Sequence, residues 1–383
     1  MNCKELFEKI DELNNKYISV LEDICNIESP TDYKAGVDAV GKYISDMASE
    51  RGWKVEVLKQ DVAGDLVCIT LNPDAQKPPI TLSGHIDTVH PVGSFGTPAV
   101  RIVDDRMYGP GVVDCKGGIV AALLAMDALY LCGFNDRPVR LLLQTDEETG
   151  SSTSGRATIN YMCDSSKDSV AFLNLEGMGD NNKVCIHRKG IANFTFAVHG
   201  KEAHSANCTK SGANAILEAA HKIIELEKLK DHDGVTCNCG VISGGTVPNT
   251  VPGYCEFKAN VRFATTEQLE WVKDYMQKVA DTVYVNGCAS SVTLTRLRIA
   301  MEYCERNQKL FDAFNELFER EELSPIVPHF GLGGSDAAEI TAAGIPCLDS
   351  FGIKGGACHS PNEYGLLSSL SDSAKRIALS YFL

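Results

Sequence analysis

The sequence predicts an α/β protein with a smaller α+β segment inserted into it. Short apolar strands alternate with helices through residues 1–187, and the same texture resumes in residues 301–383. Residues 188–300 instead have the order β-α-β-β-α-β of a ferredoxin-like unit. A chain of 383 residues is too long for one ordinary core. We therefore expect two domains, the second inserted into the first.

The α/β assignment rests on elements in the first part of the chain. Apolar residues at helical spacing run through the first 50 residues, with a break at residues 29–31. Polar or acidic residues directly follow three later strands. Because open α/β sheets bind ligands at the carboxyl ends of their strands, we expect a site at this edge. The predicted elements are a helix over residues 117–131 and strands over residues 53–57, 66–71, 79–84, 139–144 and 170–175.

The inserted segment shows a different pattern. Alternation of apolar and polar residues predicts its strands, and amphipathic spacing predicts its helices. A helix over residues 308–321 then returns the chain to the first pattern. The strands are expected over residues 191–199, 235–242, 251–263 and 291–297, and the helices over residues 213–229 and 266–279.

Composition excludes several classes of protein. The net charge of −15 argues against nucleic-acid binding, which needs a basic face. No run approaches the roughly 18 apolar residues of a membrane span, and the N-terminus lacks an apolar signal core. The chain has 15 cysteines without repeated spacing. Free thiols in this number indicate a reducing compartment, so we expect a cytoplasmic protein.

Five short motifs bring histidines and carboxylates to the predicted strand ends and to glycine-rich loops. Together they supply the side chains needed to hold two divalent metal ions and to leave one carboxylate free as a base. Each residue alone has an ordinary structural interpretation, such as a helix-capping aspartate or a solvated acidic turn. Their joint occurrence indicates a metal-dependent hydrolase. The candidates are His85, Asp87, Asp114, Glu147, Glu148, Glu176 and His359.

Spacing limits what these residues can do. Because His85 and Asp87 are two positions apart at a strand end, they share one face, and one can bind a metal while the other supports the imidazole. Adjacent residues point in different directions, so one of Glu147 and Glu148 can bind a metal while the other faces the water. Six further histidines receive no metal role: His90, His187, His199, His221, His232 and His329.

The motifs resemble those of a known enzyme family. Ser-Gly-His85-Ile-Asp87, Asp114-Cys-Lys-Gly-Gly, Asp-Glu147-Glu148, Asn-Leu-Glu176-Gly and Cys-His359-Ser-Pro-Asn-Glu are similar to motifs of co-catalytic zinc peptidases. These include glutamate carboxypeptidase, aminoacylase, acetylornithine deacetylase and succinyl-diaminopimelate desuccinylase (metallopeptidase family 20). The resemblance covers essentially the whole chain. It implies a mixed-sheet catalytic domain of residues 1–187 and 301–383, with a ferredoxin-like dimerisation or lid domain of residues 188–300 inserted in it.

The resemblance also implies roles for the candidate residues. It implies two Zn²⁺ ions per subunit, with Co²⁺ or Mn²⁺ as possible substitutes, and a cis peptide bond between Asp114 and Cys115. By resemblance, His85 and Glu176 bind one ion, Glu148 and His359 bind the other, Asp114 bridges both, Glu147 is the general base and Asp87 orients His85.

Further residues resemble substrate contacts of this family. His204 looks like the histidine that reaches the active site of the partner subunit in a homodimer and stabilises the oxyanion. Asn249 and Arg262 look like contacts to a substrate carboxylate, and Gly334 and Ser335 belong to a loop that resembles the family's substrate-side loop. The ordinary alternatives are a surface histidine and an arginine paired with an acid in a sheet.

These features predict hydrolysis of an amide beside a free carboxylate. The substrate would be a small peptide that loses its C-terminal residue, or an N-acyl amino acid, because Arg262 favours a carboxylate and Glu176 resembles the acylase and carboxypeptidase branch. Acetylornithine or succinyl-diaminopimelate deacylation is the nearest alternative, and a single-metal enzyme is another. A catalytically silent binding protein would lack the base or a ligand, and neither is missing.

Overall fold

The computed structural model describes residues 3–229 and 233–383, and the chain divides into two compact units. The first unit consists of Met1–Ile186, Tyr303–His329 and Ser335–Leu383, and the second of His187–Glu302 and Phe330–Gly334. The short segment Phe330–Gly334 is additional to the single insertion that the sequence predicts. It belongs to the second unit because main-chain pairing holds it there: Lys189 N donates to Gly331 O at 2.9 Å.

A six-stranded mixed sheet forms the centre of the first unit. Its strand order is β1-β2-β6-β3-β7-β16, in which β6, β3, β7 and β16 are parallel and β1 and β2 are antiparallel to their neighbours. His85 pairs with Gln144, and Ser83 with Asn174, so the parallel strands end at one edge. The strands are β1 (Lys54–Leu58), β2 (Leu66–Leu71), β3 (Ile80–His85), β6 (Val139–Gln144), β7 (Ala171–Asn174) and β16 (Cys347–Leu348).

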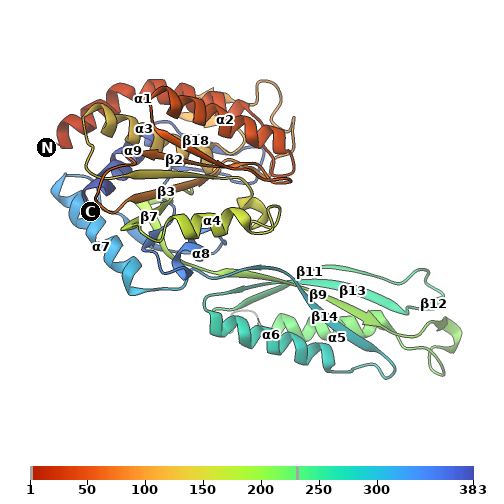
Figure 1. Ribbon diagram of the computed structural model, residues 1–383. Helices are drawn as coiled ribbons and strands as arrows, with labels where there is room; N and C mark the ends of the chain where they lie inside the picture. The colour runs from red at the N-terminus through yellow and green to blue at the C-terminus, as the bar shows by residue number, and fades with distance from the viewer. Residues whose placement is uncertain (1–2, 230–232) are drawn as a thin grey trace. The chain divides into compact units, whose positions relative to one another are not determined.

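Helices cover both faces of this sheet (Figure 1). On one side lie α1 (Cys3–Asn26), α2 (Lys34–Glu50), α3 (Gly117–Leu131) and α9 (Ser369–Leu379), and on the other α4 (Ala157–Ser165) and α8 (Ala337–Ala342). The helix α7 (Glu305–Arg320) packs against α9 and the edge strand β16. No helix in the described ranges combines the length and the apolar character needed to cross a membrane.

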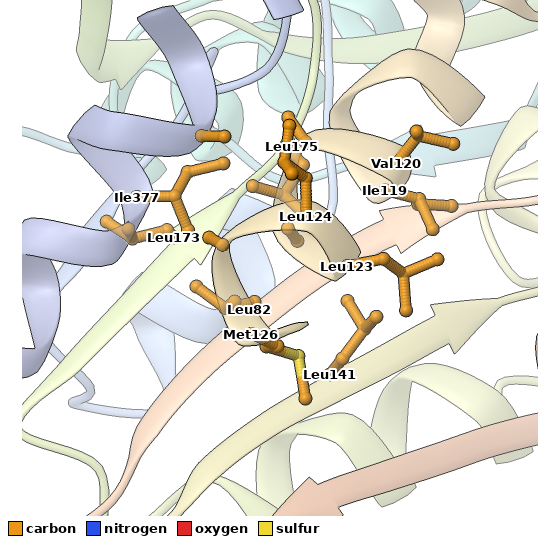
Figure 2. Packing of buried hydrophobic residues seen from close by; sticks show 14 of the residues in the cluster. Leu82, Ile119, Val120, Leu123, Leu124, Met126, Leu141, Leu173, Leu175 and Ile377 are labelled. Atoms are coloured by element: carbon orange, nitrogen blue, oxygen red, sulfur yellow. The ribbon is translucent and has the colours of Figure 1, made fainter. Parts of the chain in front are cut away.

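The core explains why α3 is apolar on nearly all sides. Its residues Gly117 to Leu129 are buried, because α3 packs against α1, α9 and the sheet. Figure 2 shows Leu123, Leu124 and Met126 of α3 beside Leu82 and Leu141 of the sheet. A helix enclosed in this way needs no polar face, and its rigid start lies directly after the Asp114 turn.

A small antiparallel sheet joins two loops that carry candidate ligands. Its order is β17-β18-β5-β4, with β4 (Arg101–Val103), β5 (Arg106–Tyr108), β17 (Gly355–Gly356) and β18 (Tyr364–Leu366). The strand β5 precedes the turn η1 (Val112–Lys116), and β18 follows the loop of His359. Because Tyr108 pairs with Tyr364, the start of the Asp114 turn lies beside the end of the His359 loop. A separate pair is formed by β8 (Lys183–Arg188) and β15 (Val327–Gly331).

The second unit is a four-stranded antiparallel sheet with two helices on one face (Figure 1). The order β11-β13-β9-β14 and the chain order β-α-β-β-α-β are those of a split βαβ unit. The predicted strand over residues 251–263 is divided at Pro252 and Gly253, because β12 pairs with β10 instead of joining the main sheet. The elements are β9 (Gly190–His199), β10 (Ala203–His204), α5 (Ala215–Leu226), β11 (Thr236–Gly244), β12 (Thr250–Val251), β13 (Tyr254–Phe263), α6 (Thr266–Asp281) and β14 (Ala289–Arg298).

Candidate metal centre

Residues that follow three parallel strands of the first unit lie close together, as the strand-end pattern predicts. His85 ends β3, Glu147 and Glu148 follow β6, and Glu176 follows β7. The Nε2 atom of His85 lies 3.8 Å from Glu176 Oε1, and ligand atoms of His85, Asp114 and Glu148 lie within 4.8 Å of one another. The common edge of the parallel strands therefore gathers groups that are far apart in sequence.

The Asp114 carboxylate lies between two histidines. Its Oδ1 atom is 3.0 Å from His85 Nε2, and its Oδ2 atom is 3.2 Å from His359 Nε2. Each imidazole also faces a second carboxylate, since His359 Nε2 is 3.4 Å from Glu148 Oε2 and His85 faces Glu176. Two imidazoles with one shared and two separate carboxylates are a donor set that fits two divalent cations.

Asp87 supports this arrangement in two ways. Its main-chain carbonyl accepts the hydrogen bond from His85 Nδ1 at 2.9 Å, whereas its carboxylate Oδ1 is 3.4 Å from that nitrogen. With Nδ1 donating this bond, Nε2 can offer its lone pair to a metal once it gives up the proton that it shares with Asp114. The buried carboxylate accepts the main-chain N–H groups of Glu147 and Glu148, each at 3.2 Å, and the hydroxyl of Thr31 at 2.7 Å. Asp87 therefore connects His85 to the turn of the two glutamates.

The electrostatics of the centre favour bound cations. Burial, and then the charge of Asp114, raise the pKa of the Glu176 carboxyl well above its usual range. Burial opposes ionisation of Asp114 too, but hydrogen bonds with His359 and His85 hold its pKa well below the usual range. Hydrogen bonds to Asp114 and Glu148 raise the pKa of His359 to about 10. Crowded, desolvated carboxylates of this kind are stabilised by nearby positive charge.

The peptide bond between Asp114 and Cys115 is cis, as the resemblance implies. The Cys115 thiol is buried, and its sulfur accepts the main-chain N–H of His85 at 3.0 Å. Burial raises the pKa of this thiol to about 12. Although its sulfur lies within 4.8 Å of ligand atoms of His85 and Glu176, the imidazole and carboxylate set is complete without it.

Two buried residues beside the centre were given no role by the sequence analysis. Lys116 donates to the carbonyls of Ile24 and Ile27 at 3.0 Å each, and so ties the turn after Asp114 to the end of α1. Glu363 accepts hydrogen bonds from the same turn. Lys116 and Glu363 belong to the motifs Asp114-Cys-Lys-Gly-Gly and His359-Ser-Pro-Asn-Glu. Their place in these motifs is the feature of the sequence that could have indicated a role. Of the histidines without a metal role, His90 bonds to Glu363, and His232 lies outside the described residues.

The predicted substrate residues of the second unit form two groups. His204 pairs with Thr250 in the β10–β12 ladder, and Asn249 O accepts from Ser205 N at 2.9 Å, so His204 and Asn249 are neighbours. Only Pro252 and Gly253 separate β12 from Tyr254, the first residue of β13, so this group lies at the Tyr254 end of that strand. Arg262 lies eight residues further along β13, about 26 Å from Tyr254 at the rise of a strand. One small molecule therefore cannot contact both groups within one unit.

Arg262 is held beside the short segment that contains Gly334. Its Nε donates to Asn260 Oδ1 at 3.1 Å, and its Nη1 donates to Leu332 O at 3.3 Å. Burial, and then the charge of Arg296, lower the pKa of Arg262, which makes its surroundings favourable for an anion. Ser335 belongs to the first unit, where its buried hydroxyl donates to Asp349 Oδ2 at 2.8 Å.

Comparisons with known proteins identify the class. Residues 81–380 match the model of Peptidase family M20/M25/M40, and the chain belongs to this family. The protein is therefore a metallohydrolase of the peptidase and deacylase type. Carboxypeptidase G2 of Pseudomonas sp. strain RS-16 is 27% identical over 372 residues, covering 95% of this chain and 88% of that protein. A succinyl-diaminopimelate desuccinylase of Rickettsia felis is 26% identical, covering 92% and 96%.

Solved structures share the fold. An aminopeptidase PepT of Bacillus cereus superposes with a TM-score of 0.78 at 20% identity, covering 96% of this chain and 98% of that chain. A dinuclear metal-binding peptidase of the M20 family from Bacillus subtilis superposes with a TM-score of 0.72 at 16% identity, covering 97% and 98%. The mixed α/β sheet is thus the fold of M20 peptidases.

Proposed function

We propose that this metallohydrolase cleaves an amide bond beside a free carboxylate. The substrate is a small peptide that loses its C-terminal residue, or an N-acyl amino acid. The observation that carries the proposal is the position of Asp114, whose two oxygens face two different imidazoles at 3.0 and 3.2 Å. This donor set fits a pair of divalent ions, for which zinc is the default with mixed imidazole and carboxylate ligation.

These contacts support the proposed ligands. His85 and Glu176 would hold one ion, Glu148 and His359 would hold the other, and Asp114 would contribute to both. Two divalent ions bound there supply a polarised scissile carbonyl and a water molecule of lowered pKa.

Glu147 is the proposed general base. It follows β6, and its main-chain N–H is fixed by Asp87. After burial, nearby carboxylates including Glu147 raise the pKa of both Glu148 and Glu176, so its charge lies within electrostatic reach of both proposed ligands. From this position Glu147 takes the proton of the attacking water and passes it to the leaving nitrogen.

Substrate recognition is assigned to the second unit. We propose that Arg262 binds the substrate carboxylate through its paired N–H groups, beside the Gly334 segment. Because the Ser335 hydroxyl is bonded to Asp349, Ser335 would contact substrate through its main chain. His204 is the proposed donor to the oxyanion, and Asn249 lies next to it.

The two groups of substrate residues lead us to propose a homodimer through the second unit. Since His204 and Asn249 lie far along the unit from Arg262, they would serve the site of the partner. Exposed apolar side chains support an interface there: Ile216 and Leu217 on α5, and Val241 and Ile242 on β11. β11 is also an edge strand of its sheet, and an apolar edge of this kind favours pairing with a second copy. We also propose a cytoplasmic location, which the 15 cysteines of the chain support.

A substrate panel tests the reaction. Release of free amino acid is measured from N-acetyl, N-succinyl and N-formyl amino acids and from dipeptides, before and after chelation and with added Zn²⁺, Co²⁺ or Mn²⁺. We expect metal-dependent cleavage of a carboxylate-bearing class. Cleavage confined to acetylornithine or succinyl-diaminopimelate would select that deacylase instead, and no cleavage with two ions bound would indicate a binding protein. The Glu147→Gln variant should bind both ions and lose turnover by at least about 10³-fold.

Mixing two inactive variants tests the dimer. His204→Ala and Glu147→Gln homodimers are mixed under subunit exchange. If His204 acts in the partner's site, half of the dimers are hybrids with one complete site, so about a quarter of wild-type activity returns. If His204 acts in its own subunit, mixing restores nothing.

A further inference from the structure

We infer that Glu363 is a positioning residue that holds the Asp114 turn and the His359 loop in one geometry, and so sets the affinity of the ion bound by Glu148 and His359. This inference rests on the proposed dinuclear centre. Glu363 touches neither proposed ion and acts through the two ligand loops.

The Glu363 carboxylate is surrounded by hydrogen-bond donors. Oε1 accepts the main-chain N–H groups of Val113 at 3.0 Å and Asp114 at 3.1 Å. Oε2 accepts the main-chain N–H of Gly111 at 3.2 Å and His90 Nε2 at 2.7 Å. The side chain is 1% exposed, so these four donors replace the water that an ionised carboxylate would otherwise bind.

The main chain of Glu363 adds a second attachment. Its carbonyl accepts Gly109 N at 3.3 Å, and its own N–H donates to Ser360 O at 3.0 Å. Glu363 also lies four residues after His359 and directly before β18, which pairs with β5. Glu363 thus connects the loop of His359 to the turn that carries Asp114. The two carboxylate oxygens of Asp114 face the centre from this turn.

The three main-chain N–H groups that Glu363 accepts belong to a turn of irregular backbone. Gly111 has φ +75°, and a Cβ at this position would lie 2.8 Å from Thr88 Cγ2. Asp114 and Cys115 depart from helical backbone angles within η1. Without the carboxylate, these three main-chain N–H groups lose their acceptor, and a buried donor without an acceptor destabilises the conformation that keeps it buried.

Chemistry explains why an acid is required at position 363. A glutamine has the same shape, but only one of its two terminal atoms accepts hydrogen bonds. In Glu363→Gln, one pair of donors, either Val113 and Asp114 or Gly111 and His90, would face an amide NH₂ group. The turn must then shift, and both Asp114 and His359 move relative to Glu148. The ion of Glu148 and His359 thus has two displaced ligands, Asp114 and His359. The other ion shares only the displaced Asp114 and retains His85 and Glu176, which Glu363 does not contact, so its loss of affinity should be smaller.

Isothermal titration calorimetry tests the inference, with metal-free protein titrated with Zn²⁺ alone. We expect two ions in the wild type, and in Glu363→Gln a loss of affinity of about tenfold or more for one ion, with the other changed much less. The absorption spectrum of the Co²⁺ protein should change with the weakened ion. Asp127→Asn is the matched control, because Asp127 is also a buried carboxylate with charged and hydroxyl donors, from Arg51 and Tyr17. It lies in α3 at about 15 Å from its start, and it should lower stability without changing either affinity.

The outcomes separate the possibilities. Unchanged affinities in Glu363→Gln, or an equal loss for both ions, would overturn the inference and leave the dinuclear centre standing. A wild type that binds fewer than two ions would overturn the centre and the inference together. If Glu363→Gln does not fold, the same titration is made with the His90→Phe variant. This variant removes one of the four donors and keeps an aromatic ring beside Phe95, 4.9 Å from the present imidazole. Because only one of the four donors is lost, it should weaken the same ion by less than the roughly tenfold expected for Glu363→Gln, and two unchanged affinities would again refute the role of Glu363.

Discussion

Replacing Gly118 by alanine perturbs the contact between the start of α3 and the strand end that carries Glu176. A Cβ at Gly118 would lie 2.0 Å from Leu175 O and 2.8 Å from Leu175 Cβ. Ordinary contacts begin at 3.4 Å, so the carbonyl would have to move by about 1.4 Å, the difference between these two distances. Leu175 has little room to retreat, because a Cβ at Gly352 would also lie 2.3 Å from the same oxygen.

Two opposing effects set the change in the free energy of unfolding of Gly118→Ala. Alanine is favoured over glycine in a helix by up to about 1 kcal/mol, whereas overpacking of a buried contact costs about 1–3 kcal/mol. Since the clash is with main chain and Gly118 is in the first turn of α3, the cost should exceed the gain. We expect a net loss of about 1–2 kcal/mol in the free energy of unfolding. Displacement of Glu176 should also weaken Zn²⁺ binding.

Urea unfolding of the metal-free protein measures the first effect, and Zn²⁺ titration measures the second. Gly41→Ala is the control, because Gly41 is a helical glycine in α2 whose Cβ would meet Ile86 and Val67 only at 3.4 Å. It should be neutral or stabilising by up to about 1 kcal/mol. A Gly118→Ala protein as stable as the wild type, with unchanged Zn²⁺ affinity, would refute the packing argument.

Three further predictions follow from the charges and the proposed site. Burial raises the pKa of Asp65, but hydrogen bonds from Lys34 and Lys59 outweigh it and lower the pKa to about 2. Asp65→Asn should therefore cost about 1 kcal/mol above pH 4, and the difference should disappear as the pH falls through 2, in urea unfolding at a series of pH values. Arg262→Lys keeps the charge but loses the paired N–H geometry, so KM for a cleaved substrate should rise about tenfold with little change in kcat; an unchanged KM would argue against carboxylate binding by Arg262. Each ion at 100 times its Kd adds about 2.7 kcal/mol of stability, so chelation should lower Tm by several degrees and Zn²⁺ should restore it, whereas an unchanged Tm would contradict a centre that binds in the folded state.

The local sequence was sufficient for the elements and for most of the candidate centre. Strands over residues 66–71 and 139–144 and the helix over residues 117–131 have the predicted bounds, because each depends on its own periodicity and on short-range signals. The same holds for the ligand candidates: parallel strands end at one edge, so residues that directly follow them must meet. His85, Glu148 and Glu176 could be grouped on that basis alone.

Contacts between segments far apart in the sequence determined the features that the local sequence did not indicate. Nothing near Glu363 in the sequence indicates that its carboxylate accepts hydrogen bonds from residues about 250 positions earlier, since that contact exists only once β18 pairs with β5. Nor does the sequence show that residues 330–334 join the second unit, or that His204 and Arg262 lie at different ends of it. Periodicity and motif spacing determined which side chains are candidates for the chemistry of this protein. The tertiary structure alone decided which backbone groups hold them, because hydrogen bonds between distant segments have no signature in the local pattern of residues.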